Sequence, residues 1–301
     1  MADNLRSAFN KRKAGSSVIK DMAEMFGIGD NTVIVEIPIE KLLENANHPF
    51  KVTDDEKLKA LAKSIAADGQ LEPIIVKDKS NGFYEILAGH RRTRASKILG
   101  RTTMQAIVAN VDDISANKIL INSNLPQRDV IYPSELARSY KLRYDDLKRE
   151  RKQNSDGRNF ETEKKIDEIL SEEFNVSKFS VYMHLHFNSL IGKFLDLLDE
   201  KKIKQKIAEQ LSYLTDTEQE LVYQIVFDRQ LCKLDERGAA ALRSEHDVRN
   251  LEYEDVINIL TPNSVKEKYK YFAKGELERY SVKFNTPEDM EKAIIEFLEQ
   301  Y

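Results

Sequence analysis

Residues 73–100 read PIIVKDKSNGFYEILAGHRRTRASKILG, and this stretch decides the fold of the amino-terminal part of the chain. Residues 73–76 are a short apolar run typical of a buried strand, and residues 83–87 have the composition of its partner. An Asn-Gly pair at 81–82 lies between them and is a strong hairpin signal. Gly89 then opens a basic helix. The stretch therefore predicts strand, turn, strand and helix, in that order.

The segments on either side extend this unit into a compact domain. Residues 33–38 and 104–110 are further runs with strand composition. Residues 54–68 repeat Leu, Ala and Ile at helical spacing, which predicts a helix with Thr53 as its N-cap. We therefore expect an α+β domain over residues 31–128.

The next part of the chain, residues 129–260, is predicted to be almost wholly helical. Within it, residues 162–190 form two short apolar-faced helices separated at Asn175, a residue that tolerates left-handed backbone geometry. Val176 or Ser177 would begin the second helix. This outline predicts a helix-turn-helix, a common DNA-reading motif. Two ordinary helices joined by a short turn would give the same pattern.

The two ends of the chain differ from these domains. Residues 1–30 are polar and end in glycine and aspartate turn residues, which predicts a flexible tail. Residues 264–301 contain an alternating run and then a helix with an apolar stripe. A segment this short cannot build a core of its own. We therefore expect it to be a small α/β domain that holds a homodimer together.

Composition narrows the class of protein. Hydrophobic residues make up 41% and charged residues 33%, which suits a folded, helix-rich chain. Cys232 is the lone cysteine, so no internal disulfide can form, and no Cys/His cluster has zinc spacing. No apolar run is long enough to span a bilayer. These features predict a cytoplasmic protein without a membrane partner. With a net charge of −4, any polyanion site must depend on local basic patches.

The basic helix carries the clearest chemical signal. Arg91, Arg92 and Arg94 crowd the start of this helix, where backbone N–H groups favour an anion. Gly89 allows the backbone to approach a ligand closely. Three guanidiniums at a helix start repel one another and oppose the helix dipole unless a polyanion compensates them. The segment therefore predicts a phosphate site, and a basic surface helix is the alternative.

These residues resemble a motif of a known family. The segment 89–95 resembles the Gly-Glu-Arg-Arg-x-Arg-Ala box of the ParB family of DNA-partition proteins, with His90 at the glutamate position. Residues 69–76 resemble that family's Gly-x-x-x-Pro-Ile-x-Val box, and residues 124–128 its Glu-Asn-x-Gln-Arg box. Residues 47–50 resemble a variant of its early Asn-Pro-x-Gln-Pro-Arg segment. One box alone is a weak signal, whereas four in order are a strong one.

The resemblance implies a ParB/sulfiredoxin-like amino-terminal domain, an all-helical helix-turn-helix middle domain and a carboxyl-terminal dimerisation domain. It also implies that CTP and Mg²⁺ bind between the boxes. The arginines would hold phosphates, and the loop before residue 74 would cover the nucleotide. The expected nucleotide-binding residues are Gln70, Leu71, Pro73, Gly89, His90, Arg91, Arg92, Arg94, Asn124, Gln127 and Arg128.

Three positions depart from the family pattern. Ser123 occupies the place of a glutamate, Pro126 resembles a one-residue insertion, and His48 lies where many members carry glutamine. These departures bear on magnesium coordination and hydrolysis more than on nucleotide binding. We therefore expect that any CTP hydrolysis is slow, and we assign no residue as catalytic or as a metal ligand.

The implied function is site-specific DNA binding in plasmid or chromosome segregation, with CTP closing the dimer into a sliding clamp. The expected partners are a palindromic, centromere-like duplex, a ParA-type ATPase reached through the basic tail, and a second copy of the chain. The protein would be nucleoid- or plasmid-associated. The expected DNA-binding residues are Ser177, Lys178, Ser180, Tyr182 and Lys202.

Two other functions stay open. A nuclease on the same fold would need clustered carboxylates for a metal ion, and Asp78, Glu85 and Asp129 make no obvious cluster. A transcription regulator with a degenerate nucleotide pocket would bind DNA without nucleotide. The chain lacks the Gly-x-x-x-x-Gly-Lys-Ser/Thr loop of the partition ATPase. It also lacks the cysteine that a sulfiredoxin needs beside the basic box.

Overall fold

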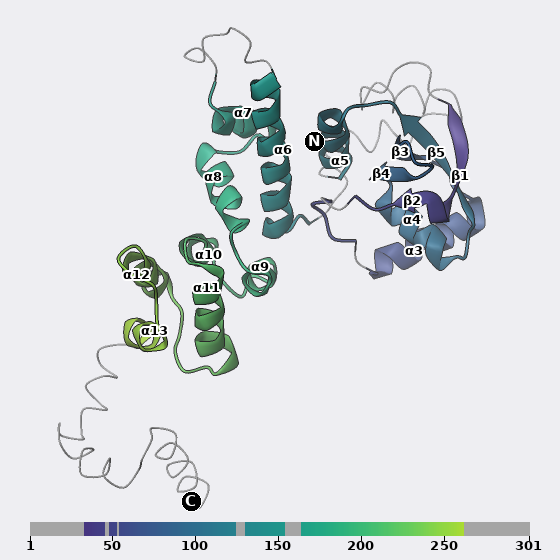
Figure 1. Ribbon diagram of the computed structural model, residues 1–301. Coiled ribbons are helices and arrows are strands. Elements are labelled where there is room, and N and C mark those ends of the chain that lie inside the picture. The colour runs from purple at the N-terminus through teal and green to yellow at the C-terminus, as the bar shows by residue number, and fades with distance from the viewer. Residues whose placement is uncertain (1–32, 46–47, 53, 125–129, 154–163, 262–301) are drawn as a thin grey trace, which may run out of the picture. The chain divides into compact units, whose positions relative to one another are not determined.

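The computed structural model describes residues 33–45, 48–52, 54–124, 130–153 and 164–261 (Figure 1). The chain divides into two compact units, with the boundary between Lys202 and Ile203, and each unit is described by itself. Some predictions lie outside the described residues: the tail over 1–30, Thr53, Pro126, Gln127, Arg128, Asp129 and the dimerisation domain over 264–301.

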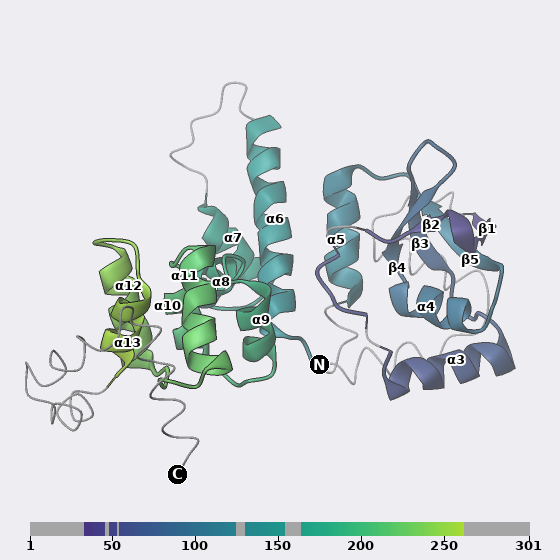
Figure 2. The same ribbon diagram turned by 60° about the horizontal axis from the view of Figure 1, so that its bottom comes forward.

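Five strands form one mixed sheet in the first unit, in the order β1-β5-β3-β4-β2 (Figures 1 and 2). The central strand β3 pairs antiparallel with β4 and parallel with β5. All four predicted strands are confirmed within two residues of their expected ends, and β2 adds a short fifth strand. The strands are β1 Ile34–Pro38, β2 Leu42–Leu43, β3 Ile74–Asp78, β4 Tyr84–Ala88 and β5 Thr103–Ala109.

The core of the sheet follows from the apolar run on β3. Ile74, Ile75 and Val76 are fully buried, as expected for a strand covered on both faces. The hairpin to β4 turns through the predicted Asn-Gly pair. Gly82 has a φ of 81°, and the side chain of Asn81 accepts the N–H of Phe83 at 3.1 Å.

Three helices accompany the sheet: α3 Glu56–Asp68, α4 His90–Ile98 and α5 Asp113–Asn124, with a short 3-10 turn η1 at Ile39–Lys41. Helix α5 packs Ala116 and Ile119 on one face of the sheet. Helices α3 and α4 pack against each other through Leu58, Ile65 and Ala95. Figures 1 and 2 show the α3–α4 pair and α5 at different sides of the sheet.

The start of α3 differs from the prediction. The N-cap is Asp55, whose side chain accepts the N–H of Leu58 at 2.8 Å, and the expectation that Thr53 caps this helix is wrong. Aspartate and threonine both cap helices well, so the sequence allowed either register. The choice matters because it places Asp54 and Asp55 at the very start of the helix, next to the basic segment on α4.

The rest of the first unit is helical: α6 Pro133–Gln153, α7 Ile166–Glu173, α8 Lys178–Phe187 and α9 Gly192–Asp199. The predicted helix, turn and helix are present as α7 and α8. Asn175 between them has a φ of 52°, in the left-handed region. Tyr140, Leu147, Leu170 and Val181 form the core that α6, α7 and α8 share.

The segment before α3 contacts the helices of the same unit. The backbone N–H of Lys51 donates to Glu135 Oε1 at 2.8 Å, and Lys51 Nζ lies 3.0 Å from Asp196 Oδ1. Asp199 accepts the hydroxyl of Ser134 at 2.6 Å. These bonds connect the amino-terminal domain to α6 and α9.

The second unit contains α10 Gln205–Leu211, α11 Asp216–Tyr223, a π-helical turn η4 at Gln224–Asp228, α12 Glu236–His246 and α13 Tyr253–Leu260. Glu218 holds three of these elements together. It accepts the backbone N–H groups of Thr215 and Leu251, each at 2.8 Å, and lies 3.0 Å from His246 Nδ1. Among the described residues, no helix combines the length and the apolar character needed to cross a membrane.

Candidate functional site

Gly89 sets the geometry of the arginine box, the segment Gly89–Arg94. It caps α4 with a φ of 98°, in the left-handed region that favours glycine. A Cβ at this position would lie 2.6 Å from Cγ2 and 3.4 Å from Cα of Ile74 on the central strand. Glycine therefore allows the first turn of α4 to begin this close to β3.

Each arginine of the box donates to an acceptor on another segment. Arg91 Nη2 lies 2.7 Å from Asp55 Oδ1, and Arg94 Nη2 lies 2.6 Å from Asp54 Oδ2. Arg92 is more buried and donates from Nη1 to the carbonyl oxygens of Glu72 and Pro73, both at 2.7 Å. Arg91 and Arg94 lie about one turn apart and face the start of α3, whereas Arg92 faces the segment before β3.

The expectation that the three guanidiniums need a bound polyanion for compensation is wrong for the folded chain. Asp54 and Asp55 supply two countercharges. The hydrogen bond from Arg91, aided by the N–H of Leu58, lowers the pKa of Asp55 to about 2 although partial burial opposes the shift. The hydrogen bond from Arg94 lowers the pKa of Asp54. Both carboxylates are therefore ionised at neutral pH, and a phosphate must compete with them for the arginines.

The loop before β3 meets the box through its backbone. The Glu72 and Pro73 carbonyls accept from Arg92, and the Glu72 carboxylate lies 3.5 Å from the same guanidinium. The Gln70 amide joins the same loop to β5, because it donates to the carbonyl of Glu72 at 3.0 Å and to that of Gln105 at 2.7 Å, and accepts the N–H of Gln105 at 2.9 Å. Leu71 is 76% exposed. The structure thus brings Pro73 to the box and ties the Gln70 amide to β5.

The tilted rings of His48 and His90 lie against each other at the start of α4. The rings of His48 and His90 have centroids 3.8 Å apart at an angle of 44°, and His90 is buried. His48 Nδ1 lies 2.6 Å from the carbonyl oxygen of the buried Phe50. The segment 48–50 therefore packs directly on the box and continues into Lys51, which bonds to α6 and α9.

Asn124 is the last residue of α5. Its Nδ2 donates to the carbonyl of Leu120 at 2.8 Å and lies 3.2 Å from Oγ of the buried Ser123. These bonds hold Asn124 within its own helix, and its contact with a triphosphate stays a prediction. Gln127 and Arg128 lie outside the described residues.

Within the described part of the chain, no group of three or more His, Cys, Asp or Glu side chains is arranged to hold a metal ion. Asp78 accepts the N–H of Ser80 at 2.7 Å, and Glu85 pairs with Lys79 at 3.4 Å. Asp78 and Glu85 therefore serve local turn and strand contacts, and the described residues offer no carboxylate cluster for a nuclease.

The predicted DNA-binding residues fall into two groups. Lys178 and Tyr182 are exposed on one face of α8, and Lys178 Nζ pairs with Glu168 of α7 at 2.5 Å, which raises the pKa of this lysine. Ser177 caps α8 by accepting the N–H of Ser180 at 3.1 Å. Ser180 itself points about 160° away from Tyr182, with its Oγ 3.5 Å from His184 Nδ1.

Lys202 lies beyond α9 and pairs with Glu200 at 2.7 Å. The structure thus brings Lys178 and Tyr182 together on the outer face of α8, and it does not bring Ser180 or Lys202 to that face. The roles of all five residues in DNA binding stay predictions.

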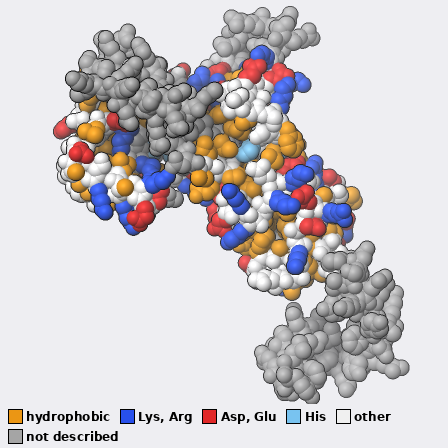
Figure 3. Space-filling view, turned by 180° about the vertical axis from the view of Figure 1, so that it is seen from behind, with side chains coloured by type: hydrophobic (Ala, Val, Ile, Leu, Met, Phe, Trp, Pro, Cys, Tyr) orange, Lys and Arg blue, Asp and Glu red, His pale blue; other side chains and the backbone are white. Residues whose placement is uncertain are grey.

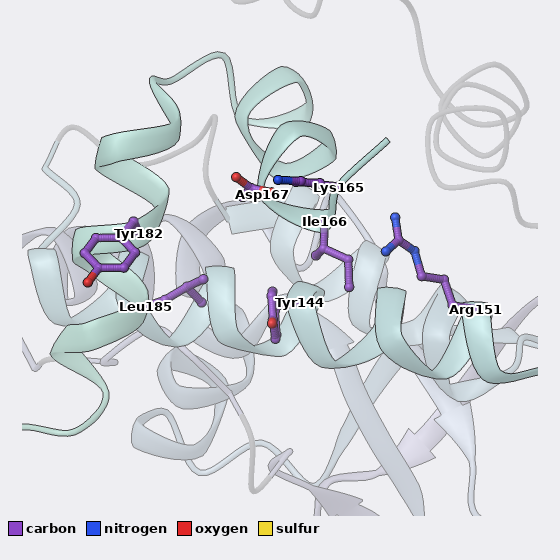
Figure 4. Close-up of a pocket in the computed structure, with 7 residues that line it drawn as sticks. All are labelled: Tyr144, Arg151, Lys165, Ile166, Asp167, Tyr182 and Leu185. Carbon is purple, nitrogen blue, oxygen red and sulfur yellow. The ribbon is translucent and has the colours of Figure 1, made fainter. Parts of the chain in front are cut away.

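A cavity of about 370 Å³ lies beside α8 (Figure 4). Its lining is mainly aromatic and apolar, with two cations and one acid: Tyr144, Arg151, Lys165, Ile166, Asp167, Tyr182 and Leu185. On the face seen in Figure 3, hydrophobic side chains gather in patches with Lys and Arg side chains beside them. Asp and Glu side chains lie among the Lys and Arg side chains on the same face.

Sequence reasoning missed three residues of these sites. Asp54 and Asp55 begin an Asp-Asp-Glu run that marks a helix start, but their pairing with α4 depends on how α3 packs. Phe179 is 65% exposed at the start of α8. A phenylalanine in an apolar-faced helix indicates a core position, and only the packing of α8 shows that this one faces outward.

The chain is similar in sequence to known proteins. The family model described as ParB N-terminal domain matches residues 25–125. The chain is 30% identical over 255 residues to the probable chromosome-partitioning protein ParB of Campylobacter jejuni, covering 83% of this chain and 85% of that protein. It is 29% identical over 213 residues to the nucleoid occlusion protein of Geobacillus thermodenitrificans, covering 70% of each.

Two crystal structures of the C-terminally truncated ParB of Caulobacter crescentus are also similar. The complex with CTP-γ-S matches at 26% identity and a TM-score of 0.30, covering 64% of this chain and 99% of that one. The complex with the centromeric parS site matches at 25% identity and a TM-score of 0.38, covering 70% and 99%.

Proposed function

The chain belongs to the ParB family of chromosome-partitioning proteins, and from this premise we propose that it is a site-specific DNA-binding partition protein controlled by CTP. In this proposal α8 reads a palindromic, centromere-like duplex. CTP with Mg²⁺ binds at the arginine box and closes the dimer into a clamp that slides along DNA. Hydrolysis is slow, because Ser123 stands where a carboxylate is expected.

The observation that carries the nucleotide part is the construction of the arginine box. Gly89 opens a left-handed turn against the central strand, and the helix that follows carries three guanidiniums within its first five residues. Backbone N–H groups at a helix start and guanidiniums are groups that bind phosphates, and this segment supplies both. Arginines on phosphates cannot distinguish CTP from ATP, so we assign the base preference to the loop 70–73.

The other proposed parts rest on the family premise and the sequence. Residues 31–128 would form the nucleotide domain, residues 129–260 the DNA-binding domain and residues 264–301 the dimerisation domain. The basic tail, with Arg6, Lys11, Arg12 and Lys13, would engage a ParA-type ATPase. Lys202 would contact a DNA phosphate and would add affinity without sequence preference.

Titration calorimetry with CTP, ATP and GTP tests the proposal, with Mg²⁺ present and with or without the preferred duplex. Wild type is expected to bind CTP best. Arg91→Ala should weaken CTP binding by about ten- to a hundredfold, because it removes a charge-assisted bond to phosphate. The same variant should still bind the preferred duplex. If no nucleotide binds wild type even with DNA present, the clamp mechanism is wrong.

A DNA-binding regulator with a degenerate pocket is the second candidate. The pairing of Arg91 with Asp55 and of Arg94 with Asp54 favours it, because these acids satisfy the arginines without a ligand. The calorimetry separates the two candidates. Sequence-specific DNA binding with no measurable nucleotide binding would establish the regulator.

A further inference from the structure

The outer face of α8 is unusually aromatic for a helix expected to read DNA. Val181, Met183, His184 and Phe187 are buried and hold α8 against its own domain. The residues left on the opposite arc of the helix are Lys178, Phe179, Tyr182 and His186, which the helical period places within about 100° of one another.

The aromatic rings of this arc are accessible. Phe179 is 65% exposed and Tyr182 is 45% exposed. The Tyr182 ring packs on His186 one turn further along the helix, with centroids 4.3 Å apart. An isolated exposed aromatic residue needs no explanation. Here the rings share the arc that begins directly after the turn of the helix-turn-helix.

The start of this arc has little capacity for direct hydrogen-bond readout of bases. Lys178 is the only lysine or arginine of the arc, and Glu168 holds its ammonium group at 2.5 Å. Phe179 carries no donor or acceptor. In the major groove, the one apolar feature of a base edge is the 5-methyl group of thymine. A phenyl ring beside the start of the recognition helix suits that methyl group and no other base-edge feature.

We infer that Phe179 is a specificity-determining residue that contacts a thymine 5-methyl group in the major groove. The inference rests on the proposed DNA-binding function of α8 and names the base that it prefers. Tyr182 lies beside Phe179 on the arc, and its ring would pack against the same methyl group. Lys178 contributes attraction to the duplex rather than the choice of base.

The test replaces thymine by uracil, which removes only the methyl group. The full chain first selects its preferred duplex from a random-sequence library, and binding is then measured by fluorescence anisotropy with uracil at each thymine in turn. At one thymine in each half-site, uracil should weaken wild-type binding by about fourfold, the effect of one buried methyl group. Phe179→Ala should bind the thymine and uracil duplexes equally at that position.

Three variants control for other effects. Phe179→Leu keeps an apolar side chain and should retain most of the thymine preference. Tyr182→Phe keeps the ring and should retain all of it. Phe83→Ala removes a partly exposed phenylalanine from the β3–β4 hairpin and should behave as wild type. Circular dichroism checks that each variant is folded.

The outcomes separate the inference from the function on which it rests. If wild type prefers one duplex but Phe179→Ala keeps the full ratio between thymine and uracil, the inference is wrong and site-specific DNA binding stands. The same holds if uracil weakens wild-type binding at no position. If no duplex is preferred over random DNA, the proposed function fails and the inference fails with it.

Discussion

At the scale of residues, the three arginines of the arginine box make their hydrogen bonds and ion pairs with residues of α3 and of the loop before β3. The charge of Arg91 and Arg94 is compensated by two aspartates at the start of α3. Arg92 lies near the Glu72 carboxylate and donates to two carbonyl oxygens before β3. A phosphate that enters the box must replace the aspartates. The folded chain therefore holds the arginines in position but makes Arg91 and Arg94 less available to a phosphate.

Removing the charge of Asp55 is expected to tighten nucleotide binding. Asp55→Asn keeps the oxygen that caps α3 but removes the carboxylate that competes with phosphate for Arg91. Because exposed ion pairs are weak, the Kd for CTP should fall by no more than about fivefold in calorimetry. Glu56→Gln, which removes an acid that pairs with Lys59, is the matched control and should leave the Kd unchanged. A weaker affinity in Asp55→Asn would show that this acid supports the site.

A methyl group at Gly89 is expected to destabilise the amino-terminal domain. Gly89→Ala adds a Cβ 2.6 Å from the Ile74 side chain. The alanine must also adopt a backbone φ of 98°, which residues other than glycine rarely adopt. We expect the free energy of unfolding, measured with urea, to fall by about 2–3 kcal/mol. Nucleotide binding should also weaken. Gly82→Ala has a similar φ of 81° but nothing within 4 Å of the new Cβ. This control should therefore lose only about 1 kcal/mol, and equal losses would contradict the steric argument.

At the scale of elements, helix ends decide much of the structure. Asp55 and Ser177 cap α3 and α8 with their own side chains, and Asn175 supplies the left-handed residue between α7 and α8. In the second unit, Glu218 accepts the N–H of its own N-cap residue Thr215 and also the N–H of Leu251 just before α13. One carboxylate therefore fixes the start of α11 and the approach to α13.

The stability of the second unit is expected to depend on pH through Glu218. Burial raises the pKa of Glu218, but bonds from Leu251, Thr215 and His246 outweigh burial and lower it to about 2. A lowered pKa means that the ionised group stabilises the fold above its unfolded pKa of about 4.3. That stabilisation should be lost as the pH falls from about 4.3 towards 2.

Thermal unfolding at several pH values checks this expectation. Glu218→Gln keeps the shape of the side chain but not its charge, so it should unfold with about 1–3 kcal/mol less stability at neutral pH. The difference in the free energy of unfolding between the variant and wild type should disappear as the pH approaches 2. A difference that persists unchanged at low pH would show that the charge of Glu218 is not responsible.

At the scale of the whole molecule, the expected clamp needs two copies of the chain. The predicted last helix carries an apolar stripe of Ala293, Ile294, Phe297 and Leu298 on a segment too short to form a core alone. Deletion of residues 264–301 should therefore give monomers in analytical sedimentation. Phe297→Asp in the full chain should also shift the sedimentation profile towards monomer, because it introduces a charge into the apolar stripe. A truncated chain that sediments as the same dimer would place the interface elsewhere.

The sequence by itself determined the main strands, the hairpin turn and the helix-turn-helix of the described chain. The apolar run at 74–76, the Asn-Gly pair at 81–82 and the glycine before the basic helix predict strand, turn and helix through local backbone preferences. The turn between α7 and α8 follows from Asn175 for the same reason. Each of these signals lies within a few residues of the structure it specifies, and the ordered boxes also identified the family.

Only the tertiary structure decided which side chains meet. Arg91 and Asp55 are 36 residues apart, and their ion pair exists because α3 packs against α4. The orientation of α8 decided that Ser180 faces His184 whereas Phe179 faces outward. Helical spacing gives the angle between two side chains, but the core of the domain decides which of them faces solvent. The charge balance of the arginine box and the reading face of α8 therefore depend on packing between segments that are distant in the sequence.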